Sequence, residues 1–140
     1  MNPFASLGRA AGRLAPAAPL ALRVGVGWVF LRHGLMKVHW GLAGVAGFLH
    51  GLGFPVAPLW AVVLIGAETV GAGCVLVGFW TRFWAACLVV DMVVAITRVL
   101  LPAGRAFELE GLLLAGALAL VALGDGPISI GALLRRRSKA

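Results

Sequence analysis

Four long apolar stretches, separated by short turn-forming segments, constrain this chain more than any other feature. They cover residues 20–38, 57–79, 83–101 and 107–123. Each is close to the roughly 20 residues that an α-helix needs to cross the hydrocarbon core of a bilayer. Lipid offers no partner to free backbone groups, and no window alternates as a membrane β-strand would, so each stretch should be helical. We therefore predict an all-α polytopic membrane protein built as a four-helix transmembrane bundle.

The balance of apolar and charged residues supports this prediction. Apolar side chains make up 61% of the 140 residues and charged ones 12%, whereas soluble domains are about half apolar and a quarter charged. A soluble chain of this length could not bury so much apolar surface. The net charge of +7 would suggest nucleic acid in a soluble protein. Here the basic residues gather at chain ends and turns without a nucleic-acid motif, so we expect no nucleic-acid partner and instead expect contact with membrane lipids.

Turn signals and charge divide the chain into three parts. Residues 1–19 are expected to form a cytoplasmic lead rather than a signal peptide, because prolines and Arg23 interrupt the apolar run that follows the first arginines. Residues 20–130 form the predicted membrane domain, and residues 131–140 a basic cytoplasmic tail. Residues 39–56 are Gly-rich and apolar. They predict a long first outer loop that lies at the interface or re-enters the membrane, with a short helix as one form.

Basic residues also predict the orientation of the chain. With the N-terminus inside, the inner side receives eight of them: Arg9, Arg13, Arg23, Arg82, Arg135, Arg136, Arg137 and Lys139. The outer side receives three: Lys37, Arg98 and Arg105. The positive-inside rule then places both termini in the cytoplasm.

Ionisable side chains within or beside the apolar stretches are the candidate functional residues. A charge at the bilayer centre costs about 2.5–3.5 kcal/mol on insertion scales, so such groups should face the bundle interior and find partners. The predicted polar core comprises Glu68, Asp91, Arg98, Glu110, Lys37 and His33. Glu68 is the strongest candidate because glycines and alanines on both sides leave room around it. Arg98 and Glu110 should lie at similar depth and form a candidate ion pair.

The first apolar stretch carries small and charged residues on one face. At spacings of four and three, this stripe comprises Arg23, Gly27, Phe30, Gly34 and Lys37. Small residues in such a stripe let another helix approach closely. Arg32 points to the opposite side, where it either reaches toward polar head groups or faces a partner protein. We favour a partner.

Two interpretations of the polar core stay open. Buried ion pairs can fix helix register without any chemistry, or the core can bind a quinone head group, a small polar group or a proton. No residue spacing supports a metal site, and no flavin, haem or iron–sulfur motif is present. No catalytic residue can be named. Electron transfer would therefore need a partner.

An ordered set of glycine, aromatic and charged residues extends over residues 20–130. It comprises Arg23, Gly27, Phe30, His33, Gly34, Lys37, Phe48, Leu52, Gly53, Phe54, Pro55, Glu68, Gly71, Gly78, Arg82, Met92, Ala95, Glu110, Leu123, Gly124, Gly126 and Ser129. The order and spacing of these residues resemble the DoxX family of bacterial four-helix membrane proteins. The charged positions that carry over are Arg23, Lys37, Glu68, Arg82 and Glu110. Arg32 and Asp91 have no counterpart in the pattern.

The resemblance implies an association with membrane redox complexes. Relatives are described as subunits of a terminal quinol oxidase or of a thiosulfate:quinone oxidoreductase. We expect a membrane subunit of such a complex, non-catalytic alone and without an intrinsic cofactor, for which quinone and lipid are candidate ligands. Its partners would be other membrane subunits or a second copy of the chain. Two alternatives remain: a structural accessory subunit of a larger respiratory or photosynthetic complex, and a small transporter or proton path built on Glu68 and Asp91.

Overall fold

The computed structural model describes residue 12 and residues 14–138, and every regular element in that part of the chain is helical. The all-α class is therefore confirmed. In chain order the elements are η1 (Ala15–Ala17), α2 (Ala18–Trp40), α3 (Leu42–Gly51), α4 (Ala57–Gly66), η2 (Ala67–Gly71), α5 (Ala72–Val77), α6 (Thr81–Val94), η3 (Ala95–Leu100), α7 (Glu108–Leu123) and α8 (Ile130–Arg137). Arg9, Arg13 and Lys139 lie outside the described residues.

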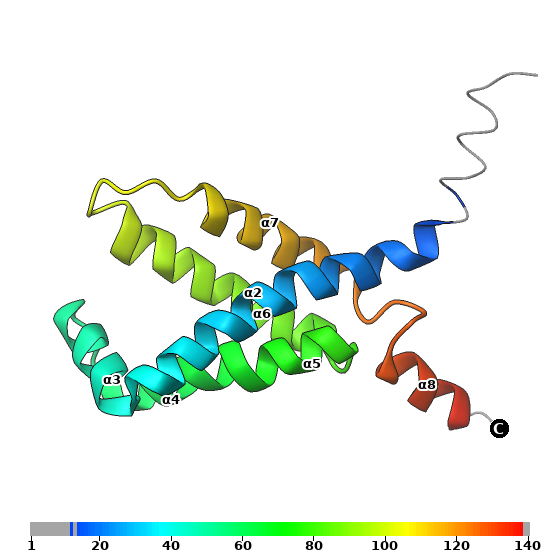
Figure 1. Cartoon of the computed structure of the whole chain (residues 1–140), viewed down its shortest axis with the longest axis horizontal. Coiled ribbons are helices and arrows are strands. Elements are labelled where there is room, and N and C mark those ends of the chain that lie inside the picture. Colours follow the sequence, from blue (N-terminus) through cyan, green and yellow to red (C-terminus); the bar gives the residue numbers. More distant parts are fainter. Residues whose placement is uncertain (1–11, 13, 139–140) are drawn as a thin grey trace, which may run out of the picture.

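Helix α2 runs along the length of the molecule, with α3 at one end and α8 at the other (Figure 1). It packs against α5, η2 and α7, while α6 and α7 form an antiparallel pair. Pro19 lies in the first turn of α2, where its missing N–H is not needed. Gly41, with a φ of 83°, ends α2, and α3 then fills most of the connection over residues 39–56.

In the described part of the chain, two continuous helical rods are long and apolar enough to cross a membrane. The first, Ala57–Val77, joins α4, η2 and α5, and the second, Thr81–Leu100, joins α6 and η3. Only 33% and 22% of their apolar windows are buried. The core helices of a soluble protein would be mostly buried, so these exposed apolar surfaces suit lipid. Helix α2 is long enough to span a membrane but carries three charged side chains. Helix α7 is apolar but has 16 residues, which is shorter than either rod.

The apolar interior is divided into two clusters. The larger one lies between α2, α5, α6 and α7 and is centred on Phe30, Leu88 and Leu120. The smaller one lies between α3 and α4 and contains Val45, Leu49, Ala57 and Ala61. Since η2 separates α4 from α5, it lies at the boundary between the two clusters.

The predicted stripe on the first apolar stretch lies inside the bundle. Arg23, Gly27, Phe30 and Gly34 are all buried, and Lys37 is half-buried. The closest approach is at Gly34, where a Cβ atom would lie 2.5 Å from the carbonyl oxygen of Glu68. Only glycine allows the backbones of α2 and η2 to come this close.

This contact makes Gly34 sensitive to the smallest substitution. Gly34→Ala should destabilise the folded protein by about 1–3 kcal/mol, because the two backbones must separate. Gly25→Ala on the same helix is the matched control, since Gly25 is exposed and a Cβ there meets nothing within 4 Å. Thermal unfolding in mild detergent measures both variants. Equal melting temperatures for Gly34→Ala and Gly25→Ala would contradict the close packing.

Candidate functional site

An ion pair between a half-buried lysine and a buried glutamate joins α2 to η2. The Nζ of Lys37 donates to Oε2 of Glu68, and the two side chains are 24% and 2% exposed. Lys37 lies one helical turn beyond Gly34, so the close backbone contact brings its ammonium group to the carboxylate of the next element. In an apolar interior the desolvated charges must be paired, which makes this contact an anchor between the two helices.

Glu68 lies on a π-helical segment, and so does Arg98. Glu68 belongs to η2 and Arg98 to η3. Each segment contains a threonine whose hydroxyl donates to the carbonyl four residues earlier: Thr69 to Ile65 and Thr97 to Val93, both at 2.6 Å. Threonine side chains bonded in this way locally distort a helix, and π-helical turns are frequent at functional sites. Glu68 therefore leaves its rod at a distorted turn.

Asp91 completes a three-residue cluster with Lys37 and Glu68. It projects from α6, and its carboxyl interacts with Glu68 and with the charge of Lys37. One of its carboxyl oxygens, Oδ2, is buried and accepts no hydrogen bond within the described residues. A buried acceptor without a partner costs about 1–3 kcal/mol. The cluster thus combines two carboxyls, one ammonium group and one free acceptor atom.

The other predicted members of the polar core lie elsewhere. Arg98 is exposed and Glu110 half-buried, and among the described residues the ion pairs are Lys37–Glu68 and Arg135–Asp125. The expected Arg98–Glu110 pair therefore does not form. Both residues lie near the exposed segment 101–107, where surroundings more polar than the core can solvate each charge separately. His33 is half-buried on α2, and the described residues group no metal ligands around it.

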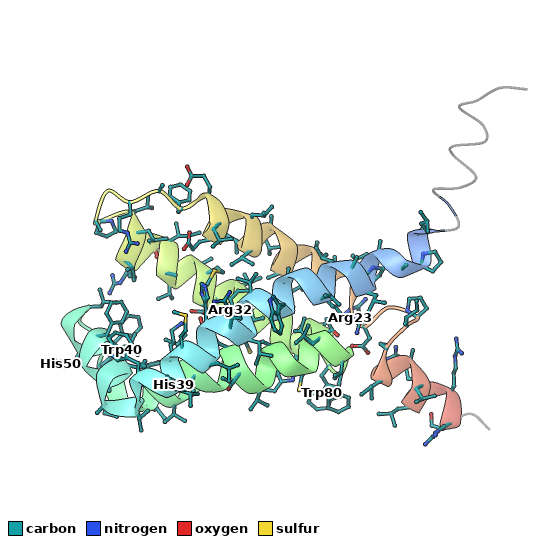
Figure 2. The ribbon with its side chains drawn as sticks, viewed as in Figure 1. Arg23, Arg32, His39, Trp40, His50 and Trp80 are labelled. Carbon is teal, nitrogen blue, oxygen red and sulfur yellow. The ribbon has the colours of Figure 1, made fainter. Side chains whose placement is uncertain are left out.

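Arg32 is exposed near the middle of α2 (Figure 2). Its exposure agrees with the prediction that it points away from the stripe, and it fits both a partner protein and polar head groups.

A second polar cluster at the opposite end of α2 centres on Arg23, which is fully buried. Its guanidinium donates to the carbonyls of Leu76, at 3.4 Å, and Ile128. It packs against Gly78, whose φ of 73° suits glycine and where any Cβ would collide with the guanidinium. Figure 2 shows Arg23 at the end of the bundle that carries Trp80, while His39, Trp40 and His50 gather near α3.

Asp125 holds the C-terminal segment onto this end of the bundle. Its Oδ1 accepts from the backbone N–H of Thr81 at 2.9 Å, and its Oδ2 accepts from Arg135 at 2.7 Å. The N–H of Gly131 also donates to the carbonyl of Gly78 at 2.9 Å. Asp125 is not among the site residues predicted from the sequence. The available signal was an acidic residue between two glycines, ten positions before an arginine.

The hydrogen bonds at Asp125 decide its titration. Burial by itself raises the pKa of this carboxyl, but the bonds from Arg135 and Thr81 outweigh that effect and hold the pKa below its ordinary value. Asp125 is therefore ionised at neutral pH and keeps Arg135 paired.

The comparison with known protein families identifies the chain by its N-terminal and central parts. The DoxX family model matches residues 18–102, more than half of the chain. The matched part contains α2 to η3, and with them Lys37, Glu68 and Asp91, but it ends before Glu110 and Asp125. No curated protein and no solved structure matches this chain.

Removing the lysine of the ion pair should be costly. Lys37→Met leaves the Glu68 carboxyl buried without its cation and should destabilise the protein by about 3–5 kcal/mol. The double variant Lys37→Met/Glu68→Gln removes both charges and should recover most of that loss. Thermal unfolding of Lys37→Met, of Glu68→Gln and of the double variant measures the coupling between the two side chains. Additive losses in the double variant would show that the pair is not coupled.

The clamp at Asp125 should depend on pH, and the protection of the Thr81 amide should depend on an acceptor oxygen at Oδ1. Because its pKa is lower in the folded chain than in the unfolded one, its stabilising contribution is complete above about pH 4 and is lost as the pH falls through the folded value. At neutral pH, Asp125→Ala should expose the Thr81 amide to hydrogen exchange. Asp125→Asn keeps an Oδ1 acceptor and should preserve most of the protection. Equal exchange at Thr81 in Asp125→Ala and the unmodified chain would contradict the clamp.

Proposed function

This chain belongs to the DoxX family, and from that premise we propose that it is a membrane subunit that binds a quinone head group for a redox complex. It does not carry out electron transfer alone in this proposal. The buried cluster of Lys37, Glu68 and Asp91 is the observation that supports it.

The chemistry of the cluster matches that of a quinone. A quinone presents two carbonyl oxygens that accept hydrogen bonds, and its reduced form presents two hydroxyls that donate them. Lys37 can donate to a carbonyl of the quinone, and the free Oδ2 of Asp91 can accept from a hydroxyl of the quinol. Carboxyls beside the bound ring can also take up or release the protons that accompany its redox change, while the partner complex supplies or removes the electrons.

We place the chain in the bacterial inner membrane with four spans, adding α2 and α7 to the two rods. Helix α2 lies alongside η2 and α5, and α7 alongside α6, so all four would share one membrane layer. Both termini are assigned to the cytoplasm by the positive-inside rule. In this orientation Arg82, Arg135, Arg136 and Arg137 lie at the inner end.

The exposed position of Arg32 supports a role as a subunit. A cation near the middle of a spanning helix is costly in lipid, and a carboxylate on a neighbouring protein would offset that cost. The same observation suits a structural accessory subunit, for which the Lys37–Glu68 pair would serve only to fix the bundle.

A proton path is the second candidate function. The carboxyls of Glu68 and Asp91 interact inside the protein, and paired carboxyls can pass a proton between them. Measurement of ligand binding separates this candidate from the first.

Asp91→Asn should weaken binding of the reduced quinol at least tenfold, because it replaces the free acceptor with an amide that can donate from that position. Binding of a short-chain quinol and its quinone to the purified full chain in lipid nanodiscs measures the effect. Glu108→Gln is the matched control, since Glu108 is an exposed carboxylate at the start of α7. Unchanged quinol affinity in Asp91→Asn, with the fold intact by circular dichroism, would exclude this site.

A further inference from the structure

A hollow of about 720 Å³ lies where the turn before α6 meets the C-terminal segment. Its walls include Trp80, Arg82, Phe83, Leu123, Asp125 and Arg135. The lining therefore combines two guanidinium groups, one carboxylate and several large apolar side chains. The candidate redox site lies in a different part of the bundle, between α2, η2 and α6.

The charge in the hollow favours an anion. Arg82 is exposed, and its Nη2 donates to the carbonyl of Ala122 at 3.2 Å. Arg135 is also exposed and uses Nη1 on Asp125. A guanidinium has five N–H donors, so both arginines keep donors for a further acceptor. Arg136 and Arg137 follow on α8 and add positive charge at the same end.

The rim of the hollow is aromatic and apolar. Trp80 is 66% exposed, and its ring stacks on Phe79 with a centroid distance of 5.9 Å. Phe83 meets the Trp80 ring edge-on at 6.3 Å. Helix α8 adds further exposed apolar side chains, namely Ile130, Leu133 and Leu134. An acyl chain could therefore pack on this apolar surface, close to the two arginines.

The position of the hollow along the rods places it at head-group depth. The first rod ends at Val77 and the second begins at Thr81, so the turn between them marks the surface of the hydrocarbon core. Exposed tryptophan is typical of that level, and a short helix with apolar side chains and a basic end is typical of segments that lie along it.

From this combination we infer that the hollow binds an anionic phospholipid, with the phosphate on Arg82 and Arg135 and an acyl chain along Trp80 and Phe83. The inference rests on the proposed membrane placement and not on the quinone site. Seven of the eleven residues that line the hollow come after residue 102, beyond the part of the chain that matches the DoxX model.

Native mass spectrometry of the full chain in mild detergent tests the inference. Phosphatidylglycerol and phosphatidylcholine with identical acyl chains are titrated in parallel, and phosphatidylglycerol should bind more tightly. Arg82→Gln should weaken phosphatidylglycerol binding about fivefold and change phosphatidylcholine binding less, because the choline ammonium already offsets the charge of that phosphate. Arg82 is the decisive position because its substitution leaves the Asp125–Arg135 pair in place. Arg105→Gln removes another exposed arginine, beyond the far end of the second rod, and should leave both lipids unaffected.

Three outcomes would overturn the inference. The first is equal binding of the two lipids. The second is a loss in Arg105→Gln as large as that in Arg82→Gln, which would indicate attraction by net charge alone. The third is displacement of phosphatidylglycerol by millimolar inorganic phosphate, which would show that the arginines bind phosphate without the lipid. Quinol binding is measured separately in Asp91→Asn, so failure of either proposal leaves the other standing.

Discussion

The buried Lys37–Glu68 pair is the contact on which the arrangement of the helices depends. It joins α2 to the segment that separates the two apolar clusters. Apolar packing alone gives little preference for one helix arrangement when the surroundings are equally apolar. A desolvated charge gives a strong preference, because any arrangement that separates the two partners leaves an ion in a medium of low dielectric. Gly34 is a condition of this contact, since a larger residue would move Lys37 away from the carboxylate.

Polar contacts of buried or half-buried cations fix α2 at both ends. Near its start, Arg23 is buried and bonded to the carbonyls of Leu76 and Ile128. Near its end, Lys37 is bonded to Glu68. The two contacts are four turns apart and lie on one face of the helix, so together they set both its rotation and its position along the neighbouring rod. Asp91 differs from these residues, because it brings a further carboxyl into the cluster without completing its hydrogen bonds. A buried acceptor atom without a partner is expected where a ligand or a proton binds.

How far the sequence could predict these features depends on the range of the interaction involved. The stripe from Arg23 to Lys37 and the interior position of Glu68 follow from helical spacing and from the cost of a charge in lipid, and both were predictable. The depth at which a residue lies says less about its partner. Arg98 and Glu110 were expected at the same level, yet both lie near an exposed segment and do not pair. The π-helical segments accompany local threonine bonds that the apolar pattern does not register. The Asp125–Arg135 pair depends on how the C-terminal segment folds back, and helical spacing carries no signal for that.

The C-terminal segment is part of the site architecture even though it lies beyond the DoxX match. Arg23 belongs to the matched residues, but the carbonyl of Ile128 is one of its two hydrogen-bond acceptors. A fully buried guanidinium needs such acceptors. Asp125 in turn holds the segment that carries Ile128 by bonding Thr81 and Arg135. The burial of Arg23, and with it the fixed position of α2 that brings Lys37 to Glu68, therefore depends on residues 124–137. The family segment and the C-terminal clamp form one structural unit in this chain.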